Sequence, residues 1–386
     1  MNQKSNAWII TILFSAVILI FTAADFLKED RLYSEAENRL LAGRPEFTVK
    51  SLLEGSYSEA YETYVTDQFV SRDKWIAIKT YWDIFLQKKE ISGVYLGTGG
   101  YLIEQHLPED YTEESIKKKL GLLKDLVERW DAKVILVPTA DNILADKLPV
   151  NAPCFDQKVF LTQAEQTIGK EYFVDVWSAL AEHAREDIYY RTDHHWTSLG
   201  AYYGYQAWAE AMGEKPYPYD EEALESVTED FLGTLHSKVN IKWKPDAIHY
   251  FPETAEWPVT VTYDFKTVSH KLYEEKYLNT KNKYGFFLDD NHGFVEIDTG
   301  HHGGRTLFLI KDSYANCFVP FLLPHYDKIY ILDLRYYHGR LFELMERYAP
   351  DVGLDMKPKN AESEDKELEV LVLYNCVHFL EDFVYD

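Results

Sequence analysis

Short apolar runs alternate with amphipathic stretches from about residue 113 onward. Residues 113–130 place apolar side chains at helical spacing, and 133–137 form a short run that is apolar after Lys133 and stops at Pro138. Continuous apolar runs are typical of strands that are buried on both faces, as in parallel sheets between helices. We therefore expect an α/β fold with a doubly wound parallel sheet of about five strands and helices on both faces. The expected strands are 133–137, 172–176, 306–310, 328–332 and 369–374, and the expected helices are 113–130, 164–168, 179–184 and 198–212.

Two regions depart from this alternation. Residues 91–104 predict a β-hairpin with a glycine-rich turn. Residues 214–300 contain several prolines and aromatic residues, and 259–263 alternate between apolar and polar side chains. This pattern predicts an inserted β and loop region at 214–300, which divides the α/β domain into residues 96–213 and 301–386.

The N-terminal region is strongly apolar. Residues 7–24 carry no charge, and a helix of that length spans about 27 Å, enough to cross the hydrocarbon core of a bilayer. Two interpretations stay open for residues 1–28, an uncleaved single-pass signal anchor and a cleaved signal peptide. Both place the rest of the chain outside the cytoplasm, at the cell membrane or secreted. Residues 29–95 are charged and amphipathic, and they predict a helical stalk or a layer on the main body.

Charge and cysteine content exclude several classes of protein. The 386-residue chain has 40 Lys and Arg against 64 Asp and Glu, a net charge of −24, which argues against nucleic-acid binding and adhesion to anionic lipid. Aromatic residues make up 15% of the chain, which suits sugar-binding clefts and equally an aromatic core. No CxxC or Cys/His spacing indicates a zinc site, and the pairing of Cys154, Cys317 and Cys376 stays open.

Two motifs carry candidate chemistry. Asp193-His194-His195-Trp196 precedes a predicted helix, and an Asp near a His fixes the imidazole tautomer for base catalysis. Lys311-Asp312-Ser313 follows a predicted strand, where a serine lies exposed at the carboxyl edge of a sheet near helix-start amides. Each motif taken alone is also consistent with simple helix capping. Together they supply Ser, His and Asp at one sheet edge.

A metal site is the rival hypothesis for these residues. Its conceivable ligands are Asp193, His194, His195, His301, His302 and Asp312. Neighbouring histidines usually point apart, and no HxH or HExxH spacing is present. We therefore expect neither a metal nor a cofactor.

With these motifs, the chain resembles the DHHW protein family, which is related to the alginate O-acetyltransferase-like branch of the SGNH (GDSL-like) hydrolases. The resemblance covers essentially all of the chain after the apolar N-terminal segment. Besides the two motifs above, it rests on residues 34–39 and 67–73 of the stalk, on 231–235 in the inserted region and on 331–337.

The resemblance implies a circularly rearranged SGNH site. In it Asp193 orients His195, His195 is the base and Ser313 is the nucleophile. Arg335 is implied near the acyl or oxyanion position. Lys311 departs from the family pattern, since many relatives have Gly before Asp-Ser. Further candidates for contacts to substrate or oxyanion are His194, Trp196, Asn316 and Asn142.

The implied function is an enzyme that transfers or removes O-acetyl groups on a cell-surface polysaccharide through an acyl-serine. The resemblance also implies a membrane-bound O-acyltransferase partner that supplies the acetyl group. A triad serves O-acetyltransferases and acetylesterases alike, so the sequence leaves these two open. The alternative is a non-catalytic carbohydrate-binding or scaffold protein of a polysaccharide-modification complex.

Overall fold

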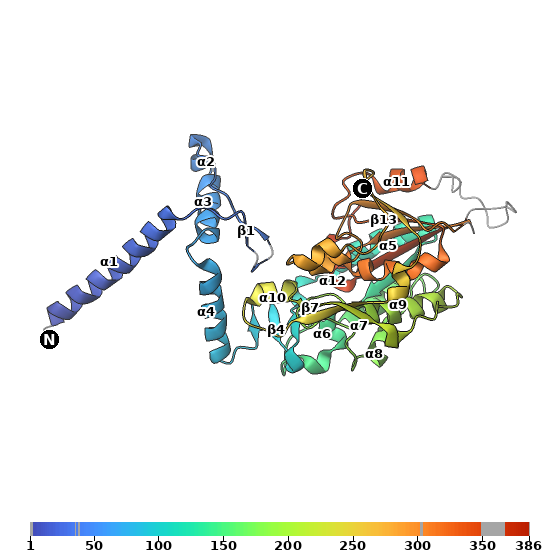
Figure 1. Cartoon of the computed structure of the whole chain (residues 1–386), viewed down its shortest axis with the longest axis horizontal. Coiled ribbons are helices and arrows are strands. Elements are labelled where there is room, and N and C mark those ends of the chain that lie inside the picture. Colours follow the sequence, from blue (N-terminus) through green and yellow to red (C-terminus); the bar gives the residue numbers. More distant parts are fainter. Residues whose placement is uncertain (1–2, 35, 38, 302–303, 349–366, 386) are drawn as a thin grey trace. The chain divides into compact units, whose positions relative to one another are not determined.

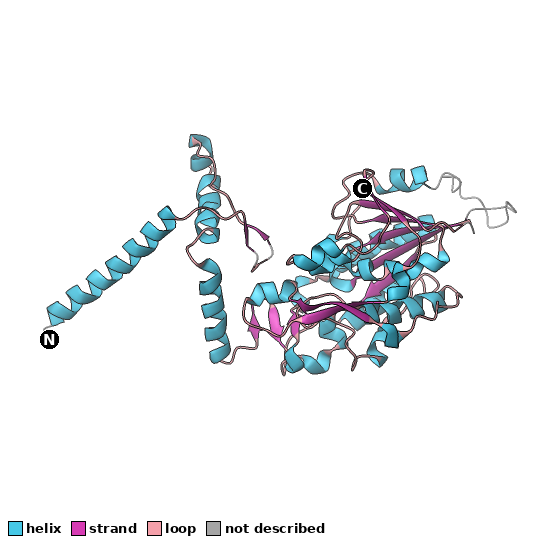
Figure 2. Ribbon diagram, viewed as in Figure 1, coloured by secondary structure: helices cyan, strands magenta, loops and turns pink. Residues whose placement is uncertain are grey.

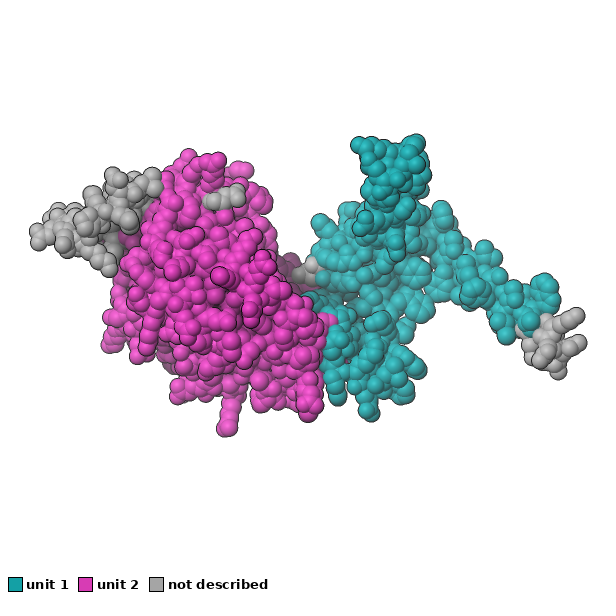
Figure 3. All heavy atoms as spheres, turned by 180° about the vertical axis from the view of Figure 1, so that it is seen from behind, with its two compact units in different colours: residues 1–92, 236–242 teal, residues 93–235, 243–386 magenta. Residues whose placement is uncertain are grey.

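The computed structural model describes residues 3–34, 36–37, 39–301, 304–348 and 367–385. They form two compact units, coloured separately in Figure 3. Unit 1 comprises Met1–Ser92 and His236–Lys242, and unit 2 comprises Gly93–Leu235 and Trp243–Asp386.

Unit 1 is mainly helical (Figure 1). Its first helix, α1 (Gln3–Leu27), contains an apolar segment, Ala7–Leu27, with a mean hydropathy of 2.4 and no part of it buried. By length and composition this segment is able to cross a membrane. The other elements of unit 1 are β1 (Tyr33–Ser34), β2 (Arg39–Leu40), α2 (Val49–Leu53), α3 (Ser56–Asp67), α4 (Arg72–Phe85) and β3 (Glu90–Ile91).

A buried carboxylate joins β2 to the end of α3. Asp67 accepts hydrogen bonds from both terminal nitrogens of Arg39, at 2.8 and 2.5 Å, and from the backbone N–H of Ala42 at 2.9 Å. The Arg39 hydrogen bonds lower the pKa of Asp67 to about 2, despite its burial. The charged sequence before α2 is therefore tied to the helices by a specific ion pair.

Unit 2 is built on one seven-stranded mixed sheet with the order β10-β9-β11-β13-β12-β14-β6 (Figure 2). Four neighbouring strands, β13, β12, β14 and β6, are parallel, and β11, β9 and β10 add antiparallel strands beyond β13. The strands are β6 (Lys133–Val137), β9 (Thr260–Tyr263), β10 (Thr267–Ser269), β11 (Phe294–Asp298), β12 (Arg305–Lys311), β13 (Lys328–Leu332) and β14 (Glu367–Asn375).

The expectation of an all-parallel sheet of five strands was therefore wrong in two respects. Strands from the 214–300 region extend the sheet, and residues 172–176 form no strand. Phe173 makes only a single bridge to Val134 at the β6 edge. The chain leaves the edge there because Asp175 accepts hydrogen bonds from Trp177 and Ser178, and so starts helix α8 (Trp177–Glu182).

Helices cover both faces of the sheet, because strand side chains alternate between two cores. In β12, Leu307 and Leu309 face one core while Phe308 and Ile310 face the other. The first core receives α6 (Ala140–Ile143), α8 and α9 (Ser198–Ala211), and the second receives α5 (Glu113–Trp130), α7 (Gln157–Ile168), α11 (Leu341–Tyr348) and α12 (Cys376–Asp382).

Within the described residues of unit 2, two antiparallel strand pairs lie outside the main sheet. The predicted hairpin is present as β4 (Val94–Leu96) and β5 (Leu102–Glu104). In the 214–300 region β7 (Glu225–Phe231) pairs with β8 (Asp246–Tyr250), and α10 (Thr234–Val239) lies between them in sequence.

The four parallel strands end at the same edge, and a polar residue follows each of them closely. Thr139 comes after β6, Asp312 and Ser313 after β12, and Asp333 after β13, while Asn375 closes β14. Ligands of open α/β sheets bind at this carboxyl edge. The topology thus gathers the polar residues of distant segments at one place.

Two glycines provide a test of the packing of unit 2. A Cβ on Gly200 in α9 would overlap the carbonyl oxygen of Ile188, whereas a Cβ on Gly121 in α5 would meet no atom within 4 Å. We expect Gly200→Ala to lower the free energy of unfolding by about 1–3 kcal/mol. Gly121→Ala should raise it by up to about 1 kcal/mol, through helix propensity. Denaturant unfolding measures the change in the free energy of unfolding in each variant. Equal changes in the two variants would contradict this packing.

Candidate active site

The turn that carries Ser313 is fixed by a buried carboxylate. Asp312 caps the 3₁₀ helix η8 (Ser313–Cys317), accepting a hydrogen bond from the Tyr314 N–H at 2.9 Å. Its second oxygen accepts from the Asn375 N–H at 3.0 Å and from the Asn375 side-chain amide at 2.9 Å. His378 Nδ1 lies 3.0 Å from the same oxygen. Asp312 thereby joins the end of β12 to the start of α12.

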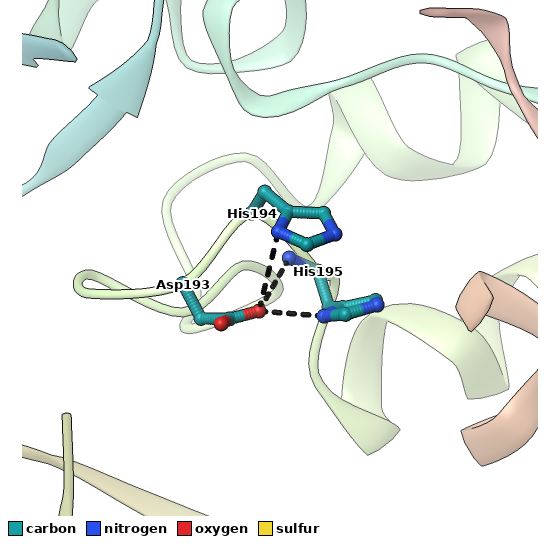
Figure 4. A group of neighbouring side chains, drawn as sticks. All are labelled: Asp193, His194 and His195. Carbon is teal, nitrogen blue, oxygen red and sulfur yellow. Dashed lines mark hydrogen bonds and ion pairs between the residues drawn. The ribbon is translucent and has the colours of Figure 1, made fainter. Parts of the chain in front are cut away.

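Ser313, His195 and Asp193 form a continuous hydrogen-bonded chain. His195 Nε2 lies 2.8 Å from Ser313 Oγ, and His195 Nδ1 lies 2.5 Å from Asp193 Oδ1. Figure 4 shows the Asp193 carboxylate directed at His195, with the His194 ring beside it. All three members of the chain are buried, although Ser313 is 118 residues from His195. The structure thus brings the three predicted catalytic residues together.

The hydrogen bonds determine the imidazole tautomer. Burial alone would raise the pKa of Asp193, but the two neighbouring imidazoles and its hydrogen bonds hold that pKa well below the usual range. An ionised carboxylate only accepts, so Nδ1 of His195 carries the proton. In the neutral imidazole Nε2 is then unprotonated and accepts from the Ser313 hydroxyl. This is the arrangement that a general base needs.

Asp193 is held by a loop that the two motifs did not include. Its second oxygen, Oδ2, accepts from the Thr234 N–H at 2.8 Å and from the Thr234 hydroxyl at 3.1 Å. Gly233 lies against Asp193 so closely that a Cβ there would overlap the carboxylate. The only sequence signal for these contacts was the family-like segment 231–235.

His194 is a neutral imidazole with one unpaired nitrogen. Its Nδ1 lies 2.8 Å from Thr234 Oγ1. Because that hydroxyl donates to Asp193, His194 Nδ1 is the donor and Nε2 carries a lone pair. Burial, followed by the neighbouring His195, lowers the pKa of His194 to about 3. Nε2 is buried and has no hydrogen-bond partner among the described residues.

Tyr284 packs against the His195 ring. Its ring stacks on the His195 ring with centroids 3.9 Å apart and planes 13° apart, and its hydroxyl donates to the Ser313 carbonyl at 3.2 Å. No sequence signal pointed to Tyr284. In the part of the chain that the structure describes, no hydrogen bond from the Ser313 N–H to a protein group is found.

A second cluster of charges lies at the end of β13. Arg335 binds Asp333 in a bidentate pair at 2.9 and 2.6 Å, and Lys311 Nζ lies 3.3 Å from the same carboxylate. Lys311 also donates to Asn316 Oδ1 at 2.7 Å. Lys311 and Arg335 thus share Asp333, and Lys311 also binds Asn316. Among the described residues, none of these three side chains has a hydrogen bond to Ser313 or His195. Lys311 belongs to this buried cluster.

Asn142 and Trp196 also have partners inside the protein. Asn142 ties α6 to the following loop through Phe155 O at 3.0 Å and the Gln157 N–H at 3.0 Å. Trp196 is fully buried and donates from Nε1 to Tyr314 O at 2.8 Å. Trp196 therefore links the two motifs through the backbone of the serine turn.

A small cavity of about 20 Å³ lies at the carboxyl edge beside His194. Its polar walls include His106 and His378, neither of which the sequence singled out. His106 Nδ1 lies 3.0 Å from Asp141. Burial opposes its charge, but Asp141 and Glu104 raise the pKa of His106 to about 10. The cavity is large enough for one water molecule or one hydroxyl group.

Asp193, His194 and His195 also form a group of possible metal ligands, with donor atoms within 4.8 Å of one another. The Asp193–His195 contact of 2.5 Å requires a proton between the two groups, and Thr234 binds both Asp193 and His194. These hydrogen bonds favour the acid–base chain over a metal centre. His302, another ligand considered above, lies outside the described residues.

Residues 123–332 match the family model described as DHHW protein. The chain belongs to the DHHW protein family. No curated protein matches this DHHW chain in sequence. A crystal structure of a DHHW family protein from Eubacterium siraeum shares its fold at 21% identity, with a TM-score of 0.59 and coverage of 77% of this chain and 97% of the other.

Two further solved structures are similar. Bacillus cereus PatB1 with a sulfonyl adduct shares 20% identity with this DHHW protein, with a TM-score of 0.55 over 72% of this chain and 93% of PatB1. The O-acetyltransferase domain of Pseudomonas putida AlgJ shares 17% identity over 76% of this chain and 94% of the domain, with a TM-score of 0.44. At these identities the likeness to PatB1 and the Eubacterium protein concerns the fold.

The contact of Gly233 with Asp193 predicts a sharp local effect. In Gly233→Ala the new Cβ should push the Asp193 carboxylate away from His195. A displacement of about 1 Å costs about 10²-fold in rate, so hydrolysis of an aryl acetate should fall by that factor. Gly43→Ala is the control, since its Cβ would meet no atom within 4 Å. Equal rates in both variants would contradict the placement of Asp193.

Proposed function

We propose that this DHHW protein is a membrane-tethered, extracytoplasmic enzyme that moves O-acetyl groups on a cell-surface polysaccharide through an acyl-serine. The observation that carries the proposal is the Ser313–His195–Asp193 chain, with contacts of 2.8 and 2.5 Å at the carboxyl edge of the sheet. Helix capping alone would not require His195 Nε2 to meet the Ser313 hydroxyl. The family relation to O-acetyltransferases supports acetyl as the transferred group.

In the first half-reaction, Ser313 Oγ attacks the acetyl carbonyl of the donor while His195 Nε2 takes the hydroxyl proton. Asp193 stabilises the imidazolium that forms. The Ser313 N–H is placed to donate to the oxyanion. When the tetrahedral intermediate collapses, the donor's oxygen leaves with the proton from His195, and acetyl-Ser313 remains.

In the second half-reaction, a sugar hydroxyl gives its proton to His195 Nε2 and attacks the acetyl-serine. Collapse returns the proton to Ser313 Oγ and releases the acetylated sugar. If water takes the place of the sugar, the products are acetate and free enzyme. The unpaired Nε2 of His194 is suited to accept a hydrogen bond from a second hydroxyl of the incoming sugar.

The N-terminal helix supports the proposed location. The Ala7–Leu27 segment is apolar and unburied, and as an anchor it would hold the enzyme at the membrane surface. There the acetyl group would come from a membrane-bound O-acyltransferase partner. The net charge of −24 suits a neutral or cationic glycan as substrate.

Acetate release from an aryl acetate by the purified full-length protein tests the nucleophile and the base. Ser313→Ala and His195→Ala should each lower kcat by roughly 10⁴-fold or more, and the double variant should lose little further. Ser226→Ala, at an exposed serine in β7, is the matched control. Full activity in either single variant would refute the proposed mechanism.

A serine-directed fluorophosphonate separates an enzyme with a strict acceptor requirement from a non-catalytic glycan-binding protein. The probe should label Ser313 in the unmodified protein, and labelling should disappear in His195→Ala because the serine is no longer activated. Mass spectrometry of the labelled peptide identifies the site. A protein that is folded but never labelled would be a binding or scaffold protein.

Asp193→Asn tests the tautomer. The asparagine amide keeps the size of the carboxylate but can donate to His195 Nδ1, which would move the imidazole proton to Nε2. We expect kcat for aryl acetate to fall by about 10⁴-fold with little change in KM. A rise in KM of similar size with kcat unchanged would mean that Asp193 binds substrate and does not orient the base.

A further inference from the structure

A second, larger pocket lies in the 214–300 region of unit 2, apart from the triad. Its volume is about 370 Å³, within the range of small-molecule binding sites. The walls come from β7 and β8, the turn that follows β8, and the segments around residues 270–278 and 286. None of the residues that line it belongs to the Ser–His–Asp chain.

Aromatic rings form much of its wall. Tyr273 and Phe286 are stacked with centroids 5.0 Å apart, and Tyr250 packs edge-on against them at 5.2 and 5.9 Å. Trp257 also lines the pocket and is partly exposed. Such rings present flat apolar surface together with polar groups at their edges.

The rim carries hydrogen-bonding groups of both charges. His270, Lys271 and Glu275 are exposed and line the pocket. On the wall, the Tyr273 hydroxyl is hydrogen-bonded to the Thr254 hydroxyl. A pyranose ring matches this chemistry, because its C–H faces are apolar and its hydroxyls point outward around the ring. Opposite charges on Lys271 and Glu275 favour an uncharged sugar over a uronate.

One short helical turn joins this pocket to the catalytic base. The 3₁₀ helix η7 (Lys283–Phe286) places Phe286 in the pocket wall. Two residues earlier on the same turn, Tyr284 stacks on His195 and donates to the carbonyl of Ser313. A ligand held against Phe286 is thus held on the element that also packs against the base.

We propose that this pocket is a glycan-binding subsite, which takes an uncharged sugar ring of the polysaccharide beside the residue that is acetylated. The assignment of the ligand as the acceptor glycan rests on the proposed function. The binding of a sugar ring by the pocket does not depend on catalysis.

Binding is measured by calorimetry on the full-length Ser313→Ala protein, in a detergent without a sugar head group. The probes are cellohexaose, xylohexaose and chitohexaose. At least one of these should bind, and Trp257→Ala in the same background should weaken its Kd about tenfold through loss of stacking. Phe265→Ala is the matched control, because Phe265 is an exposed aromatic of the same region that does not line the pocket.

Leu278→Trp is a second variant, which fills the pocket from a partly buried wall position and removes no ring. It should abolish oligosaccharide binding while thermal unfolding stays within a few degrees of the parent. Binding that survives both Trp257→Ala and Leu278→Trp would overturn the subsite, as would the failure of all three oligosaccharides to bind.

Catalysis separates this proposal from the proposed function. In the catalytically competent protein, Trp257→Ala should leave acetate release from an aryl acetate within about twofold and raise KM for the bound oligosaccharide as acceptor about tenfold. Pocket-dependent binding without acetate release, acetyl transfer or labelling of Ser313 would refute the enzyme and keep the subsite. Acetyl transfer that is insensitive to Trp257→Ala would refute the subsite and keep the enzyme.

Discussion

The candidate active site depends on the buried carboxylate of Asp312. Removing a charge from water is costly unless it is fully hydrogen-bonded, and Asp312 meets this requirement with partners from two separate segments. The Tyr314 N–H fixes the turn after β12, while Asn375 and His378 hold the start of α12. The orientation of Ser313 follows from this junction, and the loop that carries His195 then meets Ser313 at hydrogen-bond distance.

Much of the site could be predicted because its signals are local. Short apolar runs located β6, β12 and β13, and the two motifs held all three members of the hydrogen-bonded chain. The antiparallel extension could not be predicted, since β9 to β11 are short and pair with partners whose identity depends on tertiary packing. Residues 172–176 are apolar enough for a strand, yet the capping by Asp175 ends their pairing after one bridge.

The remaining contacts were not predictable for a different reason. Thr234 and Tyr284 act on Asp193 and His195 across long sequence separations, and no spacing rule connects them. Asn142 and Trp196 show another limit, because residue types that suit a substrate contact also join segments of the protein. Chemistry in a motif indicates what a side chain is able to do, and only packing decides which group it meets.

The strand order has a consequence for biosynthesis. β14 is the last of the sheet strands along the chain, but it lies between β12 and β6. Until residues 367–375 have been synthesised, β6 therefore has no strand neighbour in the sheet to pair with, and Asp312 lacks the Asn375 donors that fix the serine turn. The centre of this sheet is closed last, so a growing chain carries an unassembled site until residues 367–375 have emerged.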